Sequence, residues 1–133
     1  MQRQDPGVPI ERLREVAHAF PGLDALILYG SRARGDAIPH SDWDLGYLAS
    51  GELDAGDLHA VIVETLGDDR VDLVDLGDAG AQLRYRVAGD GRALFERLPH
   101  RFERFRLEAI AYWLDMAPII RAEYEAHLEK FSR

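Results

Sequence analysis

The stretch that decides the fold is GSRARGDAIPHSDWDLGYL, residues 30–48, where a glycine–serine pair and two aspartates separate two apolar runs. Residues 23–30, LDALILYG, are a short apolar run that ends at a glycine. In residues 42–49, DWDLGYLA, successive residues alternate between two faces. Both patterns predict β-strands. The alternation divides the second strand into two faces, with Asp42, Asp44, Gly46 and Leu48 on one and Trp43, Leu45, Tyr47 and Ala49 on the other.

Asp42 and Asp44 would project from the same face of this strand, with Cα atoms ~6–7 Å apart. Two neighbouring carboxylates that are shielded from water are costly unless a positive charge lies between them. Hard oxygen ligands select Mg²⁺ or Mn²⁺, and Mg²⁺ commonly takes only one or two carboxylates and completes its coordination with water and substrate phosphates. The pair therefore predicts a site for a metal-bound nucleotide; the alternative is two solvated aspartates at an exposed strand end.

The glycine–serine pair strengthens the first interpretation. Gly30 allows a tight turn and a close approach of a ligand to the backbone, and Ser31 begins a helical turn or tight loop whose free N–H groups suit a phosphate. Arg32 and Arg34 can add charge-assisted hydrogen bonds to phosphate oxygens, although both can also be solvated surface residues. Neither the P-loop pattern nor the dinucleotide-binding glycine pattern occurs in the sequence.

A third carboxylate is expected from residues 70–77, RVDLVDLG, which we interpret as a strand. Apolar residues occur on both of its faces, which predicts a central position in the sheet. Asp72 and Asp75 have opposite parity in this strand, so at most one of them can face the aspartate pair. Parity alone leaves the choice between them open.

The rest of the chain predicts an α/β (α+β) domain. Helical spacing and turn residues indicate helices over 9–20, 52–67 and 79–90, a short strand over 92–96 and a helical segment from 99 to 131. Pro118 should kink or split that last segment near 116–117. We expect one domain, with a core of residues 1–98 and a C-terminal helical segment, 99–133, packed on it.

Composition narrows the classes of function. The chain has 133 residues, of which 47% are hydrophobic, and no cysteine, which excludes disulfides and thiolate metal sites. A formal net charge of −8 argues against nucleic acid as a direct partner. We find neither a signal-peptide core nor an apolar run approaching the ~20 residues of a membrane span, so we expect a cytoplasmic protein without membrane contact.

One pattern of residues begins at Gly30-Ser31, continues after ten intervening residues with Asp42-Trp43-Asp44, and ends at a later aspartate in the VDLVDL segment. This pattern resembles that of the nucleotidyltransferases of the DNA polymerase beta superfamily. The short chain with a helical tail resembles the minimal nucleotidyltransferase (MNT) branch, and more narrowly the MntA-type antitoxins of HEPN–MNT (type VII) toxin–antitoxin pairs. The similarity is strongest over residues 24–76. Trp43 departs from the pattern, since it is bulkier than the aliphatic residue expected between the aspartates.

The resemblance implies a small mixed sheet flanked by helices and transfer of AMP from ATP with release of pyrophosphate. By position, Asp42, Asp44 and Asp72 would be the catalytic carboxylates and would bind two Mg²⁺ ions, with Mn²⁺ as an alternative. Asp72 would also be a candidate base, with Asp75 as its rival. Gly30 and Ser31 would hold the triphosphate.

For function, the resemblance implies an antitoxin that attaches AMP to a tyrosine hydroxyl of a cognate HEPN ribonuclease toxin, with which it would form a hetero-oligomer. The apolar stripe of the C-terminal segment would pack on the sheet or contact the toxin. Two other hypotheses compete: a nucleotidyltransferase for a small molecule or another protein, and a non-enzymatic module that covers a toxin. Residues 99–133 are few for an extra substrate domain, and the intact motif argues against a module that only covers its partner.

Overall fold

The computed structural model describes residues 7–131 of the chain. Its elements are α1 (Gly7–Ala19), β1 (Leu23–Tyr29), α2 (Ser31–Arg34), β2 (Trp43–Ala49), α3 (Ala55–Leu66), β3 (Val71–Asp75), α4 (Ala81–Asp90), β4 (Arg92–Glu96) and α5 (Arg101–Phe131). The predicted helices and strands are confirmed, with ends that shift by a few residues. No helix in this described range has an apolar stretch long enough to cross a membrane.

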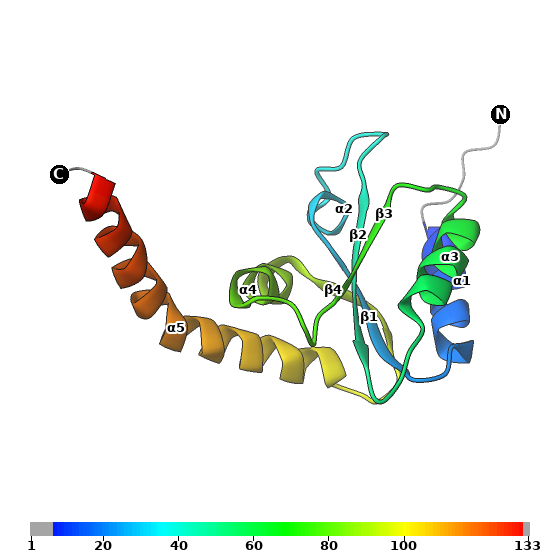
Figure 1. The fold of residues 1–133 in the computed structure, drawn as a ribbon. Helices are drawn as coiled ribbons and strands as arrows, with labels where there is room; N and C mark the ends of the chain where they lie inside the picture. The colour runs from blue at the N-terminus through cyan, green and yellow to red at the C-terminus, as the bar shows by residue number, and fades with distance from the viewer. Residues whose placement is uncertain (1–6, 132–133) are drawn as a thin grey trace.

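The four strands form one mixed sheet in the order β3-β2-β1-β4. β1 is antiparallel to both of its neighbours, and β2 and β3 are parallel. α1 and α3 lie on one face of the sheet, and α4 and the first part of α5 lie on the other (Figure 1). β1 and β2 are the two inner strands, and the apolar run of β1 is buried along nearly its whole length.

The alternation predicted for β2 is confirmed by the two hydrophobic clusters. Leu45 and Tyr47 are buried in the cluster under α1 and α3, where Trp43 and Ala49 also pack. Leu48 belongs to the opposite cluster, under α4 and α5. The face that carries Asp44 is therefore the face covered by α4 and α5.

The predicted central position of the third strand is wrong: β3 is an edge strand, paired only with β2. Its apolar residues on both faces are covered by helices rather than by a second neighbouring strand. Leu73 packs in the cluster under α1 and α3, and Val74 packs in the cluster under α4 and α5. A strand at the edge of a sheet covered on both faces has the same apolar composition as a central strand, so composition could not distinguish them.

α5 is one continuous helix that contains Pro118. Figure 1 shows it bending in its middle part, as proline in a helix interior predicts, without splitting in two. Phe102, Phe105 and Ala109, near its start, are buried against the sheet. The C-terminal part extends away from the sheet (Figure 1).

A glycine-to-alanine pair tests the packing over β2. A Cβ on Gly46 would lie 2.7–2.8 Å from the side-chain carbons of Leu76, which is fully buried and cannot move aside. We expect Gly46→Ala to lower the free energy of unfolding by about 1–3 kcal/mol in urea denaturation, because overpacking strains a close-packed core. Gly89→Ala is the control: nothing lies within 4 Å of its added Cβ in α4, so it should raise stability by about 0.5–1 kcal/mol. Equal urea midpoints for the two variants would contradict this account.

Candidate active site

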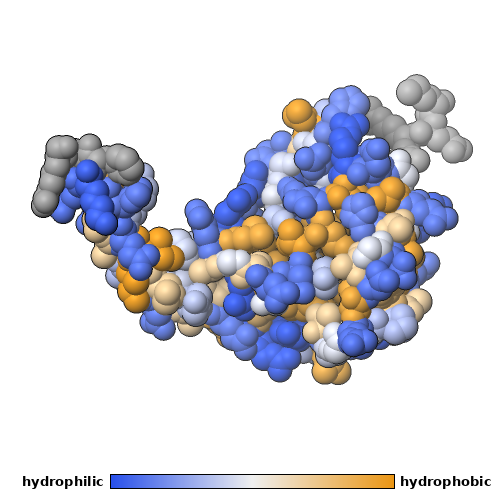
Figure 2. Space-filling model, in the orientation of Figure 1, coloured by the Kyte–Doolittle hydropathy of each residue, from blue (hydrophilic) through white to orange (hydrophobic). Residues whose placement is uncertain are grey.

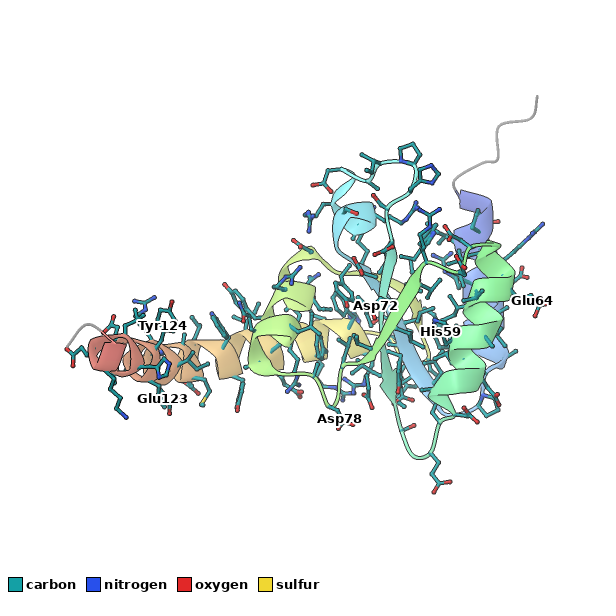
Figure 3. All side chains as sticks on the ribbon, turned by 45° about the horizontal axis from the view of Figure 1, so that its top comes forward. His59, Glu64, Asp72, Asp78, Glu123 and Tyr124 are labelled. Carbon is teal, nitrogen blue, oxygen red and sulfur yellow. The ribbon has the colours of Figure 1, made fainter. Side chains whose placement is uncertain are left out.

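A row of three polar side chains crosses the sheet near the end of β1. Tyr29 pairs with Asp44 in the β1–β2 register, and Asp44 pairs with Asp72 in the β2–β3 register. Residues paired in this way project from the same face of a sheet. Figure 3 shows Asp72 on β3, the edge strand of this row. Asp42 lies just before β2 and is exposed, close enough to act electrostatically on Asp44.

Asp75 projects from the other face of β3. Its carboxylate accepts a hydrogen bond of 2.8 Å from the Gly77 N–H. It also lies beside Tyr47, whose pKa is raised mainly by burial and next by the charge of Asp75. The structure therefore brings Asp72, and not Asp75, to the side of Asp44.

Gly30 makes room for the Asp44 carboxylate. Its φ of 74° is in the left-handed region, and a Cβ there would overlap Asp44 Oδ2 and lie 3.2 Å from Asp44 Cγ. The close approach expected at Gly30 is thus made, in this structure, by a carboxylate of the protein itself. Gly30 also precedes α2, whose first residue is Ser31. The first N–H groups of a helix have no acceptor within the helix, so those at the start of α2 are left to bind another acceptor.

The carboxylates disturb one another's ionisation. Burial raises the pKa of Asp44, and the negative charges of Asp72 and then Asp42 raise it further. Arg86 and Arg34 oppose this pKa shift without cancelling it. Burial, and next the negative charges of Asp72 and Asp44, raise the pKa of Tyr29 to about 12. The site therefore carries negative charge that the described side chains do not fully balance.

Arg32, which we expected to bind phosphate oxygens, contacts the loop before β2 instead. Its Nη2 and Nε donate to the Ser41 carbonyl at 2.8 and 3.2 Å, and its guanidinium lies 4.2 Å from the centre of the Trp43 ring. Arg32 therefore braces the loop that leads into β2. The same contact explains the bulky residue between the two aspartates, because Trp43 supplies the surface on which Arg32 stacks.

Arg34 links α2 to the end of α4. It forms ion pairs with Asp36 at 3.3 Å and with Asp90 at 3.1 Å. Its positive charge also lowers the pKa of Asp44, which places it within electrostatic range of the carboxylates. Both of its ion pairs are solvent-exposed, so a more strongly charged anion can compete for its guanidinium.

Two arginines near the site carry no motif that would have identified them. Arg86, on α4, acts electrostatically on both Asp44 and Tyr29, and only the packing of α4 over the sheet brings it there. Arg70 donates to the His40 carbonyl at 3.0 Å. Arg70 also lines an open cavity of about 200 Å³, together with Asp42, Asp69, Val71 and Asp72.

The donor set suits a hard divalent cation whose remaining ligands come from substrate. Within residues 7–131 no group of three or more His, Cys, Asp or Glu side chains is already arranged as a metal cluster. Asp44 and Asp72 nevertheless lie side by side in register, and the raised pKa of Asp44 reports unbalanced negative charge there. A two-carboxylate clamp completed by phosphate oxygens and water is a common Mg²⁺ arrangement.

The pKa of Asp44 predicts how this site affects stability. Between the ordinary aspartate value and the raised folded value, the native state binds more protons than the unfolded state, so stability falls as pH rises and stays reduced above that range. We expect Asp44→Asn to raise the melting temperature of the metal-free protein at pH 7, with a gain that shrinks as pH falls through the raised pKa of Asp44 and is lost below its ordinary value of 3.8.

The control for Asp44→Asn is Asp115→Asn, which removes one negative charge from an exposed position on α5. This control should leave the melting temperature nearly unchanged at both pH values. A destabilised Asp44→Asn protein at pH 7, measured with a metal chelator present, would contradict the interpretation of the site as a strained negative cluster.

Known proteins match this chain over most of its length. Residues 11–100 match the family model described as polymerase beta, nucleotidyltransferase. The chain is 27% identical over 144 residues to the protein adenylyltransferase MntA of Aphanizomenon flos-aquae (strain 2012/KM1/D3), covering 96% of this chain and 95% of that protein.

Solved structures match this chain over nearly its whole length. A crystal structure of a toxin–antitoxin with AMP-PNP matches with a TM-score of 0.68 and 28% identity, over 94% of this chain and 97% of that one. An MNT antitoxin in complex with the tri-AMPylated HEPN toxin of Shewanella oneidensis matches with a TM-score of 0.61 and 27% identity, over 93% of each chain. This chain belongs to the polymerase beta nucleotidyltransferase family.

Proposed function

We propose that this protein is an antitoxin that transfers AMP from ATP to a tyrosine hydroxyl of a cognate HEPN ribonuclease toxin and thereby neutralises it. The observation that carries the proposal is the placement of Asp44 and Asp72 side by side, against Gly30 and the start of α2. The similarity to a protein adenylyltransferase and to an antitoxin in complex with an AMPylated toxin supports this acceptor over a small molecule. The reaction would take place in the cytoplasm, where ATP is available.

The α2 end of the site would bind the nucleotide. The N–H groups that begin α2, at Ser31 and the residue after it, lack acceptors within the helix and would donate to phosphate oxygens. Arg34 and Arg86 would donate charge-assisted hydrogen bonds to the triphosphate. Arg32, which we expected among these nucleotide ligands, would act by holding the loop before β2 in place.

Asp42, Asp44 and Asp72 would hold two Mg²⁺ ions, or Mn²⁺ in their place. When bound, such ions lower the pKa of an incoming hydroxyl and neutralise the leaving pyrophosphate. Asp72 is the carboxylate we assign as base, because it is exposed at the sheet edge and open to a partner's side chain. The acceptor oxygen bonds to the α-phosphorus, its proton passes to Asp72, and the bond to the bridging oxygen of pyrophosphate breaks.

The product explains neutralisation in physical terms. Each transferred AMP adds a bulky anion to the toxin, and an anion near an RNA-binding surface repels the phosphate backbone. We propose residues 1–98 as the catalytic core and residues 99–133 as the segment that contributes to partner contact.

A transfer assay tests the proposal and the choice of base. The protein is incubated with ATP, Mg²⁺ and the neighbouring-gene toxin, and the toxin is weighed by mass spectrometry. We expect additions of about 329 Da for each AMP, the mass that adenylation adds to a hydroxyl. Asp44→Asn and Asp72→Asn should reduce the rate by about 100-fold or more, because both remove charge that acts on the reacting groups.

Asp75→Asn is the matched control for Asp72→Asn, since it lies three residues away on the opposite face of the same strand. It should retain most of the transfer activity. Neutralisation of the toxin by the Asp44→Asn protein, with no mass gain, would show that covering the toxin is sufficient. Equal loss in the Asp72 and Asp75 variants would overturn the assignment of the base.

Arg86 provides a test of triphosphate binding. We expect Arg86→Ala to raise the KM for ATP by about 10- to 100-fold, the effect of losing a hydrogen bond to a charged group. Arg104→Ala, which removes an exposed arginine on α5, should leave the KM unchanged. Unchanged KM in both variants would exclude Arg86 from the nucleotide site.

A further inference from the structure

The apolar stripe of α5 does not end where the sheet ends. Phe105 and Ala109 are 1% and 2% exposed, Trp113 and Ala117 are half-buried, and farther along Ile120 and Tyr124 are 41% and 63% exposed. These positions are spaced by three or four residues, so they lie on one face of the helix. The face that packs on the sheet therefore continues as an exposed apolar surface.

We call the part of α5 from residue 113 onward the arm, and its apolar face, formed by the half-buried Trp113 and Ala117 and the exposed Ile120 and Tyr124, the arm stripe. The arm stripe is continuous with the core, because the Trp113 ring stacks on Tyr85 of α4 at 5.3 Å between ring centres. Its spacing of four, three and four residues is that of a coiled-coil seam. An apolar seam with this spacing fits another helix.

The position of the arm relates this surface to the chemistry. The arm and α4 lie on the side of the sheet that also carries Asp44 and Asp72, opposite α1 and α3 (Figure 1). Figure 2 shows the surface hollowed between the arm and the body of the protein, and Figure 3 shows Tyr124 far out along the arm. A protein seated on the arm would therefore occupy the side on which the carboxylates react.

We propose that the arm stripe docks an apolar helix face of the toxin, bordered by basic residues, and so holds the acceptor hydroxyl within reach of the carboxylates. This inference rests on the proposed function, because it names the surface by which that partner is captured. The solved antitoxins seen with toxins match this chain over 93–94% of its length, a share that must include part of the arm.

Charge favours such a partner over a second copy of this chain. The arm carries the acidic residues Asp115, Glu123, Glu125 and Glu129 against the basic residues Arg121 and Lys130, and the whole chain has a net charge of −8. Two copies would bring together surfaces of the same net sign, which costs free energy. A partner with basic residues beside its apolar helix face gains from the same charges.

The experiment compares two faces of the arm. The double variant Ile120→Asp with Tyr124→Asp places charge in the arm stripe, whereas Ala122→Asp places it on the opposite side of the same turn, at an exposed position. Titration calorimetry with the purified toxin should show binding weakened about 100-fold by the double variant and by less than threefold by Ala122→Asp. Transfer of AMP by the double variant should fall at low toxin concentration and recover at high concentration.

Asp44→Asn separates failure of this inference from failure of the proposed function. It should bind the toxin with unchanged affinity while losing transfer, so binding is measured whether or not AMP is transferred. Wild-type affinity in the double variant would overturn the arm stripe as the docking surface. Sedimentation of the protein alone as a dimer that the double variant breaks would assign the stripe to a second copy instead.

A crosslinking measurement tests the same surface without the charged variant, so its result does not depend on how that variant folds. A photoreactive amino acid in place of Tyr124 should crosslink to the toxin, and the same amino acid in place of Ala122 should not. Crosslinks that join two copies of this chain, or that form equally at both positions, would also overturn the proposal.

Discussion

The site depends on the close approach of the Asp44 carboxylate to Gly30. A carboxylate can sit against the backbone there only because position 30 has no Cβ and has a positive φ. The same approach brings Asp44 beside the start of α2, where N–H groups lack acceptors within the helix. Carboxylates and backbone N–H groups without helical acceptors therefore lie close together, an arrangement suited to a metal-bound triphosphate.

This arrangement is unfavourable for the protein without its substrate. Burial and two neighbouring carboxylates raise the pKa of Asp44, and the nearby arginines offset only part of the effect. The rest of the fold has to hold the carboxylates in place, and β1 does so as an inner strand, buried along nearly its whole length, to which β2 pairs. Stability is thus reduced locally at the site where cations and phosphate would supply the missing balance.

The two parts of helix α5 have different surroundings. Near the sheet, the stripe of α5 completes the hydrophobic core through Phe102 and Phe105. Beyond Trp113 the same stripe is exposed, on a helix that extends from the side of the sheet on which the carboxylates lie (Figure 1). One helix can thus support the catalytic sheet and present a surface to a partner, which suits an enzyme whose acceptor is a residue of another protein.

Local sequence was enough to predict most of the fold and the core of the site. The strands around residues 23–30 and 42–49, and the face of β2 that carries Asp44, follow from hydrophobic spacing, which is a local property of the chain. Asp42, which was predicted on the same strand face, lies just before β2. Spacing could not show that β3 is an edge strand, because helices cover both faces of an edge strand as they would a central one.

Only the tertiary structure decided between Asp72 and Asp75, since that choice depends on the register of β3 against β2. It also brought Arg86 to the carboxylates and turned Arg32 toward the Ser41 carbonyl. Contacts between residues distant in sequence depend on how elements pack, and no local pattern records them. The carboxylates of the candidate site could therefore be predicted from the chain, whereas the residues that surround them were decided by packing.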